Sequence, residues 1–411
     1  MKKMDGLKIW LLQLGEPSPL QEDNVRLRTT LLAEKLADRG HKVLMWSSAF
    51  EHARKQWLVD GDEVKKVKNY EIYFLKGLGY RRNFSILRFL DHRLIAWKFR
   101  RVSSKMEKPD LIVASLPTYD LAYEAVEFSR KNNLPVVVDL RDKWPDIMLE
   151  YVPPFLRVLF RVALYFEFRM VQRCIRDADA LVAMMRLLLG WGLKYAKREK
   201  TDRDRVFYLG CSKPDEGEKE SENISSLLGS IKGKFVVAYV GSFSKANDPT
   251  VIVDSAREMG GDRVCYVLAG DGELFDKVKK RSEGLPNVFF TGWLAKDEIY
   301  SLLKNSDVGV CAPAGEFFPN KAFTYMSYGL PLLSSCDGEL RDVIEKNVMG
   351  LYFSQNDFRQ LTKHIKTLVA DKILHQRMST NSKRVFDERF DADIIYSEYA
   401  GYLESVVQSK H

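Results

Sequence analysis

The sequence predicts an α/β fold with two doubly wound domains, each a parallel sheet covered by helices on both faces. Apolar strand-like runs alternate with helical segments along the chain, as they do in βαβ units. The alternation stops at a polar stretch near the middle and then starts again. The 411 residues also exceed what one hydrophobic core usually serves, so two domains are expected.

The first half of the chain carries this alternation from its beginning. A helix is expected over 24–39, where apolar residues recur at helical spacing and Gly40 follows as a natural terminator. Another helix is expected to end near Asn132. Strands are expected at 7–14, from 43 to 46, 109–115, 134–142, 177–184 and 204–210.

The segment 211–226 is polar and charged, which is typical of a linker or surface loop. Strands then recur in "KFVVAYVGS", "RVCYVLAGDG", "NVFFTGW", "DVGVCAP" and "PLLSS", with helices near 249–259, 273–283 and 296–305. The expected domain organisation is an N-terminal domain, a linker, a C-terminal ligand-binding domain and a final helix that packs back on the first domain. The corresponding ranges are 1–212, 213–232, 233–385 and 386–411.

Composition narrows the class of protein. The net charge of +8 favours an anionic partner. The five cysteines are scattered and odd in number, which indicates reduced thiols in a cytoplasmic protein. The apolar run near the N-terminus is short and lacks a small-residue cleavage site, so we interpret it as a first strand. No stretch has the roughly 18 apolar residues that a membrane-spanning helix needs.

Small residues follow the strands of the second half. Gly241 and Ser242 follow the first, Asp271 lies in the "GDG" after the second, and Trp293 follows the third. Ligands of such sheets bind at the carboxyl ends of the strands. A single glycine turn is more often only a tight turn, but the repetition along one edge favours a ligand site.

The stretch "GEFFPNKAFTYMSYGLP", residues 315–331, is the most informative of these ends. Asn320 is expected to cap a helix whose first turn, with its free N–H groups and positive dipole end, attracts phosphate. Lys321 adds a full charge there, and Glu316 can accept hydrogen bonds from hydroxyls. Phosphate together with a polyol is the chemistry of a nucleotide sugar. The alternative is an exposed lysine and glutamate beside an ordinary core helix.

Residues 235–352 resemble the C-terminal domain of the retaining family 4 glycosyltransferases, which have the GT-B fold. The motifs "LAGDGE", "NVFFTGW" and "GEFFPNKAFTYMSYGLPLLSS" occur in the family's order. In the first half, "LLAEKLADRGHKV" resembles the family's first helix. "LRDKWPD" is similar to a motif of the L-fucosamine-transferase-like members, which act on O-antigen and capsule sugars.

This resemblance implies roles for residues around the donor sugar and its phosphates. Glu316 matches the first glutamate of a Glu-x7-Glu motif and would contact the sugar hydroxyls. Lys321 matches a lysine near the diphosphate. The Gly241–Ser242 turn would face the phosphates, with Lys245 in place of the family's usual arginine.

The resemblance also implies contacts to the nucleoside. Trp293 and Leu294 fall where the family holds the base. The second glutamate of the motif, which binds ribose, is replaced by Thr324, whose hydroxyl binds more weakly than a carboxylate. The other residues expected to bind the nucleotide-sugar donor are Gly15, Asp271, Asn320 and Ala322.

In the first half, Arg141, Asp142 and Asp146 end a strand at the expected ligand-binding edge, where Asp142 is a candidate catalytic residue. The alternative is that these residues form a structural ion pair beneath a buried Trp144. None of the six histidines follows an expected strand directly, so all are expected to be surface or structural residues. The resemblance implies retention at the anomeric carbon, with the leaving diphosphate assisting the acceptor hydroxyl. We expect no cofactor and no metal, because we identify no cluster of His and Asp residues with metal-ligand spacing.

Positive charge gathers in two segments of the N-terminal domain. Residues 80–101 contain seven Lys or Arg, one acid and five aromatic residues. Residues 155–176 place Arg157, Arg161, Arg169 and Arg173 on one face of an expected apolar helix. Basic amphipathic helices with aromatic residues lie on anionic membranes. We discount nucleic acid, the rival partner, because the basic residues lie on helices; a solvated helix packed on the domain is the other alternative.

The sequence therefore predicts a hexosyl- or N-acetylhexosaminyltransferase that moves a sugar from a nucleotide diphosphate-sugar to a lipid-linked saccharide. It would act in surface polysaccharide (lipopolysaccharide) biosynthesis on the inner face of the cytoplasmic membrane. Two alternatives remain open. One is a nucleotide-sugar 2-epimerase-like enzyme, and the other is a non-catalytic scaffold with the same fold, which the threonine at position 324 favours.

Overall fold

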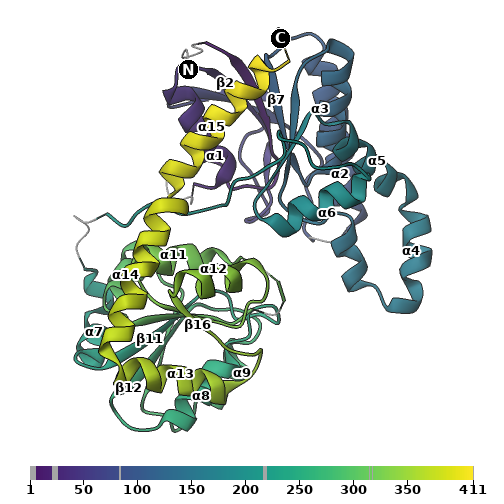
Figure 1. Cartoon of the computed structure of the whole chain (residues 1–411). Helices are drawn as coiled ribbons and strands as arrows, with labels where there is room; N and C mark the ends of the chain where they lie inside the picture. Colours follow the sequence, from purple (N-terminus) through teal and green to yellow (C-terminus); the bar gives the residue numbers. More distant parts are fainter. Residues whose placement is uncertain are drawn as a thin grey trace. The chain divides into compact units, whose positions relative to one another are not determined.

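The computed structural model describes residues 6–20, 26–82, 85–215, 220–313, 315–316 and 318–410. The chain divides into two compact units (Figure 1). Unit 1 comprises Met1–Leu209 together with Ile395–His411, and unit 2 comprises Gly210–Ile394. Each unit has its own mainly parallel sheet, as the alternation of strands and helices predicts.

The described part of unit 1 contains an eight-stranded sheet in the order β10-β9-β8-β7-β1-β2-β6-β5. All neighbours pair in parallel except β5 and β6, which form an antiparallel edge. A separate two-stranded ribbon pairs β3 with β4. The strands are β1 (Lys8–Leu12), β2 (Lys42–Ser48), β3 (Phe50–Glu51), β4 (Gln56–Trp57), β5 (Glu63–Val67), β6 (Tyr70–Leu75), β7 (Leu111–Leu116), β8 (Val136–Leu140), β9 (Ala180–Ala183) and β10 (Arg205–Val206).

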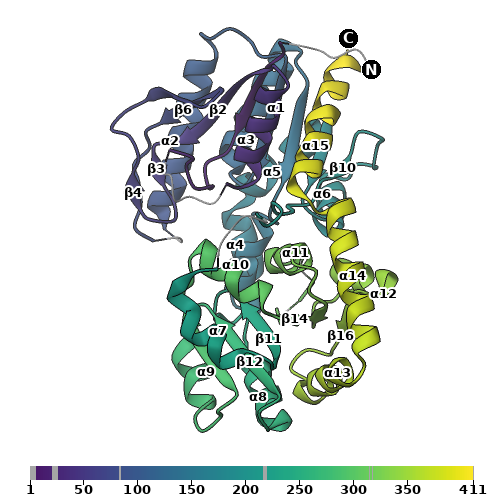
Figure 2. The ribbon, with the colours of Figure 1, turned by 90° about the vertical axis from the view of Figure 1, so that its left-hand side faces the viewer.

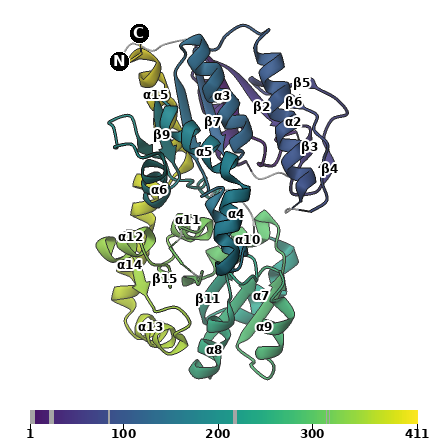
Figure 3. The ribbon, with the colours of Figure 1, turned by 90° about the vertical axis from the view of Figure 1, so that its right-hand side faces the viewer.

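Helices cover both faces of this sheet. In Figure 2, α1 and α15 lie on the near face, and in Figure 3, α3 and α5 lie on the opposite face. The helices of unit 1 are α1 (Arg28–Asp38), α2 (Ile86–Ser103), α3 (Tyr119–Asn132), η1 (Asp146–Tyr151), η2 (Pro154–Leu156), α4 (Arg157–Ala163), α5 (Tyr165–Asp177) and α6 (Arg186–Ala196). The last helix, α15 (Ala392–Gln408), belongs to unit 1 from Ile395 onward.

Aromatic packing fills the core of unit 1 beneath α2 and α3. Trp10 of β1 and Trp46 of β2 are fully buried, with ring centroids 5.3 Å apart. The ring of Phe99 from α2 lies 4.9 Å from Trp46 in an edge-to-face arrangement. Such pairs add to the stabilisation that burial of apolar surface already provides.

A buried charge network joins the start of α1 to the end of β8. The guanidinium of Arg28 donates to Asp139 at 2.8 and 3.0 Å, and both side chains are almost completely inaccessible to solvent. Arg28 also lies over the ring of Tyr399 from α15, 5.1 Å from its centroid. Arg141 and Glu16 complete the network, so two cations face two carboxylates. The network therefore fixes α1, β8 and α15 together.

Unit 2 has a six-stranded sheet in the order β13-β12-β11-β14-β15-β16, and its neighbouring strands pair in parallel. The strands are β11 (Phe235–Val240), β12 (Val264–Ala269), β13 (Val288–Gly292), β14 (Val308–Cys311), β15 (Leu332–Ser334) and β16 (Gly350–Tyr352). The helices are η3 (Glu222–Ile224), α7 (Ser225–Ile231), α8 (Thr250–Met259), α9 (Phe275–Arg281), α10 (Lys296–Lys304), α11 (Asn320–Ser327), α12 (Glu339–Asn347), α13 (Phe358–Ala370) and α14 (Lys372–Arg389).

Two apolar layers cover the faces of this second sheet. Side chains of α8 and α13 pack in one layer, and those of α7 and α10 pack in the other. The range 213–232, which we expected as a linker, includes η3 and α7. Ile224 and Ile231 of this range are buried in the second layer, so this part is structural rather than a linker.

The structure differs from the expectations in two further ways. The strands β5 and β6 were not expected; β5 has the sequence EVKKV, and none of its residues is buried. The expected helix over 155–176 is broken at Leu164, where α4 ends and α5 begins. Its four arginines therefore do not share one helical face. None of the helices in the described ranges is both long enough and apolar enough to cross a bilayer.

We predict that Asp139→Asn lowers the free energy of unfolding by about 3–5 kcal/mol, because removing one partner of a buried ion pair leaves an uncompensated charge. Urea denaturation followed by tryptophan fluorescence measures this. The control is Asp38→Asn, an exposed residue at the end of α1, whose loss should cost less than about 0.5 kcal/mol. Equal effects of the two substitutions would contradict the structural role of the network.

Candidate functional site

The order of strands in unit 2 reverses at β11, which pairs with β12 on one side and with β14 on the other. In open α/β sheets, ligands bind at the carboxyl ends of strands where the order reverses. The turn after β11 begins at Gly241, and the loop after β14 leads to α11. The predicted donor-site residues of the second half thus come from loops at this edge or from the helix that follows β14.

Lys321, in the first turn of α11, is the central residue of this edge. Its Nζ lies 3.8 Å from the centroid of the Tyr239 ring. A Cβ on Gly241 would lie 2.6 Å from the same nitrogen, so the ammonium sits directly against the turn. Nζ is buried and has no hydrogen-bond partner among the residues that the structure describes. Burial lowers the pKa of Lys321 to about 8.

The turns around Lys321 require glycine. Gly270 has a φ of +140°, and a Cβ there would lie 1.9 Å from the carbonyl oxygen of Gly241. Gly272 has a φ of +149°, and a Cβ there would lie 2.5 Å from the oxygen of Phe243. The loops after β11 and β12 therefore pack backbone against backbone, which side chains would prevent.

The loop and helix after β14 carry the expected sugar-binding and phosphate-binding residues. Glu316 is exposed and packs against Gly338, just before α12. The expected N-cap role of Asn320 is wrong, because α11 begins at Asn320 and Pro319 is its N-cap. Ala322 is buried, and its N–H donates to Pro319, so this amide is not available to a phosphate. The amides of Asn320 and Lys321 precede it in the first turn.

Thr324 lies one turn further along α11. It is partly buried, and its hydroxyl contacts the thiol of Cys211. Burial is also the largest effect on this thiol and raises its pKa to about 12. The structure thus gives Thr324 a packing contact within unit 2, in addition to the expected role at the ribose.

The other expected donor residues differ in accessibility. Ser242, Lys245 and Asp271 are exposed at the ends of β11 and β12. The carboxylate of Asp271 accepts from the N–H of Gly272, so it also stabilises its own turn. The side chain of Trp293 is 79% exposed. That of Leu294 is buried in the core, so only its backbone can contact a base.

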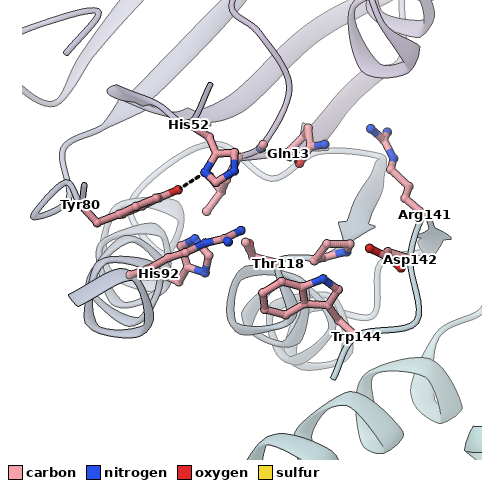
Figure 4. Close-up of a pocket in the computed structure, with 12 residues that line it drawn as sticks. Gln13, His52, Tyr80, His92, Thr118, Arg141, Asp142 and Trp144 are labelled. Atoms are coloured by element: carbon pink, nitrogen blue, oxygen red, sulfur yellow. Dashed lines mark hydrogen bonds between the residues drawn. The ribbon is translucent and has the colours of Figure 1, made fainter. Parts of the chain in front are cut away.

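Unit 1 has a pocket of about 310 Å³ at its own reversal of strand order, between β1 and β7 (Figure 4). Figure 4 shows His52, Tyr80, His92 and Trp144 around a common space. The lining residues are Gln13, Leu14, Gly15, His52, Tyr80, Arg88, His92, Pro117, Thr118, Arg141, Asp142 and Trp144.

Of the residues predicted in the first half, Gly15, Arg141 and Asp142 line this pocket. Arg141 also donates to Glu16, Asp139 and the hydroxyl of Thr29, so it belongs to a structural ion-pair network as well. Asp146 accepts from the indole of Trp191, at 2.9 Å, and does not line the pocket.

The expectation that every histidine is a surface or structural residue stays a prediction for His52 and His92, which line the pocket. Burial lowers the pKa of His52 to about 4 and that of His92 to about 3, and Arg88 adds to both effects. Both rings are therefore neutral at physiological pH. Neither histidine directly follows a strand that the sequence predicts, so no local sequence pattern indicated that their side chains line the same pocket. His41, His364 and His375 have structural partners, and His411 lies outside the described residues.

The described residues contain no group of three or more His, Cys, Asp or Glu side chains that could hold a metal ion. The five cysteines are free thiols, four of them buried. The arrangement instead offers a buried cation with two helix amides in unit 2 and a pocket of mixed polar and aromatic groups in unit 1. Such groups bind anions and hydroxyls.

The fold is that of the GT-B glycosyltransferases. Residues 220–385, which lie in unit 2, match the family described as "Glycosyl transferases group 1". Among solved structures, HepE of Anabaena in complex with UDP and glucose is 18% identical, with a TM-score of 0.67 over 97% of this chain and all of that one. WaaG, a glycosyltransferase of lipopolysaccharide biosynthesis, is 14% identical, with a TM-score of 0.64 over 97% and 99% of the two chains.

The matches to curated relatives cover a smaller part of the chain. The O-antigen chain mannosyltransferase C of Escherichia coli is 26% identical over 215 residues, which are 51% of this chain and 56% of that protein. The chain thus spans about half the length of the curated relatives it matches. These matches agree with the expected fold and with homology to glycosyltransferases.

We predict that Lys321→Met raises the free energy of unfolding by about 1–3 kcal/mol near neutral pH, because a buried, unpaired ammonium is replaced by an apolar chain of similar length. The folded pKa lies below the ordinary value for lysine, so the penalty is full below about pH 8 and fades as the pH rises toward about 10.5. Thermal unfolding at several pH values measures this gain.

The matched control is Lys346→Met on α12, where the ammonium is exposed. This substitution should change the free energy of unfolding by less than about 0.5 kcal/mol at any of these pH values. A melting temperature of Lys321→Met below that of the unsubstituted protein would show that the ammonium has a stabilising partner.

Proposed function

We propose that this protein is a retaining glycosyltransferase that takes a hexosyl or N-acetylhexosaminyl group from a nucleotide diphosphate-sugar. The acceptor is a lipid-linked saccharide in the synthesis of a surface polysaccharide. The observation that carries the proposal is the buried ammonium of Lys321, set against Gly241 at the start of α11 within the segment that matches the glycosyltransferase group 1 family.

An unpartnered buried ammonium is costly to a folded protein, and such groups gather at functional sites. A diphosphate supplies the missing partner. The positive end of α11 and the amides of its first turn add to the attraction. The neighbour HepE was crystallised with UDP, which supports a nucleoside diphosphate as the ligand.

The remaining donor residues fit the same ligand. Glu316 is exposed on the loop before α11 and can accept hydrogen bonds from sugar hydroxyls. Trp293 exposes its ring, which can hold a base, and Thr324 would contact the ribose. Ser242 and Lys245 flank the phosphates in this arrangement.

The reaction breaks the bond between the anomeric carbon and the diphosphate oxygen and forms a bond to the acceptor oxygen on the same face. The acceptor hydroxyl passes its proton to the leaving diphosphate. Lys321 and the helix amides stabilise the charge that grows on the diphosphate, and such preorganised stabilisation is usually the largest contribution to catalysis. Asp142 would orient the acceptor or the sugar. We expect turnover to persist in EDTA, because Lys321 supplies the positive charge.

We propose further that the segment from Pro154 to Phe166 rests on the anionic inner face of the cytoplasmic membrane. Figure 1 shows α4 projecting from the rest of unit 1 as an arm. None of the residues of η2 or α4 is buried. The side chains of Phe155, Val158 and Phe166 are 81%, 74% and 75% exposed. Arg157 and Arg161 lie among them, and arginines beside inserted apolar residues attract anionic lipid.

The finer family assignment is part of the same proposal. Membership of family 4 and of its L-fucosamine-transferase-like subgroup rests on the resemblance of the sequence motifs. The epimerase alternative would need several acidic and histidine residues in its cleft. The pocket of unit 1 has His52 and His92, but Asp142 is the one acidic lining residue that the structure describes. The scaffold alternative is decided by the ligand tests below.

We predict that one of UDP, GDP, TDP, ADP and CMP raises the melting temperature of the protein, and that Lys321→Met weakens this ligand by roughly 10–100-fold. The reason is the loss of a charge-assisted contact worth about 1.5–3 kcal/mol. Glu316→Gln should leave the affinity for the nucleoside diphosphate unchanged and lower turnover of the nucleotide sugar. Calorimetry and release of the nucleoside diphosphate are the two measurements. No shift with any nucleotide, with or without vesicles, would favour the scaffold.

We predict that the protein sediments with vesicles containing phosphatidylglycerol and less with pure phosphatidylcholine, and that added salt weakens the binding. The variant Phe155→Ser/Leu159→Ser/Phe166→Ser should bind at least about tenfold more weakly, because each inserted side chain contributes about 1.5–3 kcal/mol. Ile373→Ser, on α14, is the matched control, since its side chain is 84% exposed. Unchanged sedimentation of the triple variant would exclude this segment as the contact.

A further inference from the structure

The ring of Tyr239, near the end of β11, lies directly against the ammonium of Lys321. Nζ is 3.8 Å from the centroid of the ring, and the side chain of Tyr239 is fully buried. The electron-rich face of an aromatic ring attracts a cation within about 6 Å, and the attraction is stronger when both groups are shielded from water. The ring therefore offsets part of the cost of burying this ammonium.

Two contacts hold the Tyr239 ring in this position. The ring of Phe243 packs against its edge or face nearly at a right angle, with the centroids 5.7 Å apart and the planes at 84°. The hydroxyl of Tyr239 lies 2.8 Å from the carbonyl oxygen of Ser242 and 3.1 Å from that of Asn247, and its one proton can go to either. Burial raises the pKa of this hydroxyl above its ordinary range, so it stays a neutral donor.

The loop that receives this hydroxyl is itself fixed to the loop after β12. The N–H of Phe243 donates to the carbonyl of Asp271 at 2.9 Å, and the N–H of Leu274 donates to the carbonyl of Phe243 at 3.0 Å. The loop 241–247, which would face the phosphates, is thus a fixed frame. Tyr239 is bonded to this frame, and its ring carries the same fixed position to the ammonium.

The other titratable groups that act on Lys321 are two thiols. Cys311 ends β14 and Cys336 follows β15, and both are buried. Burial raises the pKa of both thiols, that of Cys336 to about 11, so both are neutral at physiological pH. Since Nζ has no hydrogen-bond partner among the described residues, the ring of Tyr239 is the described group that is placed to favour the charged amine.

A ring and a diphosphate can hold the same ammonium from different sides. The ammonium has three N–H donors, and a ring on one side leaves donors free for phosphate oxygens. The protonated amine makes charge-assisted hydrogen bonds, which are roughly twice as strong as neutral ones. A group that favours the protonated amine therefore also favours the binding of a diphosphate.

We propose that Tyr239 is a positioning residue of the donor site, whose ring holds the protonated amine of Lys321 at the Gly241 turn, ready for a diphosphate. The inference rests on the proposed function and makes it more specific, since it names the residue that controls the charge of the phosphate-binding lysine. Burial lowers the pKa of Lys321 to about 8, so a modest change in the attraction of the ring alters the charged fraction near neutral pH.

The first test needs no ligand. NMR of the full chain labelled with carbon-13 at Cε of lysine gives the pKa of Lys321, whose signal is assigned by its absence in Lys321→Met. We compare Tyr239→Phe with a protein that carries trifluorophenylalanine at this position, because fluorine removes the negative charge of the ring face at nearly the same size. Fluorination should lower the pKa of Lys321 by about 1, whereas Tyr239→Phe should change it by less than about 0.3.

The second test is the affinity for whichever of UDP, GDP, TDP and ADP binds most tightly, measured by calorimetry at several pH values. A pKa lower by about 1 should weaken this ligand less than about twofold at about pH 6.5 and by roughly ninefold at about pH 9. At the lower pH the amine is charged in both proteins, and as the pH rises the fluorinated protein loses the charge first. Ionisation of the ligand is common to both proteins and cancels.

The matched control is Tyr266, a buried tyrosine of β12 whose hydroxyl lies 3.3 Å from Oγ of Ser255. The same two replacements at Tyr266 should leave the pKa of Lys321 and the pH dependence of binding unchanged. Melting temperatures establish that each variant is folded.

An unchanged pKa of Lys321 after fluorination would overturn the inference. A loss of affinity that is equal at every pH would overturn it as well, because Tyr239 would then only support the fold. Failure of the proposed function has a different signature, since none of the four nucleotides would bind the unsubstituted protein at any pH. The titration of the free protein would still report whether the ring holds the ammonium.

Discussion

The positions of both candidate sites follow from one constraint on parallel sheets. A connection between parallel strands is right-handed, so a chain that builds outward first on one side and then on the other must place its helices on opposite faces. A crevice remains at the carboxyl ends of the two strands where the direction changes. These strands are β1 and β7 in unit 1, and β11 and β14 in unit 2. The pocket with Gly15 and the turn with Lys321 lie at these two reversals.

The two units treat buried charge in opposite ways. In unit 1, Arg28 and Arg141 are matched by Asp139 and Glu16, so the network is neutral and can hold three elements in place. In unit 2, Lys321 is buried without such a partner among the described residues. A matched network stabilises a fold, whereas an unmatched cation stores electrostatic free energy that a bound anion can release. Whether a buried cation has a carboxylate partner therefore distinguishes a structural role from a ligand-binding one, and its position in the sequence does not.

Exposed apolar side chains likewise distinguish a candidate contact surface from the packed core. A soluble helix normally buries one face, but α4 buries none of its residues. The arm that it forms belongs to unit 1, the unit that also holds the pocket with Gly15.

The sequence by itself determined the features that depend on neighbours along the chain. Strand and helix periodicity, the glycine turns after β11 and β12, and the charge of the loop before α11 are local, and they predicted the fold and the edge where Lys321 lies. The beginning of α11 was misjudged by one residue, because Asn320 and Pro319 both suit a helix start.

Tertiary structure decided the rest. Arg28 meets Asp139 across 111 residues, and the same network holds Arg141, at the edge of the pocket, against Asp139 and Glu16. His52 and His92 meet at the pocket only because β3 and α2 converge on Tyr80. The break at Leu164 is likewise invisible to helical periodicity, which continues through it. Such features depend on contacts between distant segments, and no local pattern of residues encodes them.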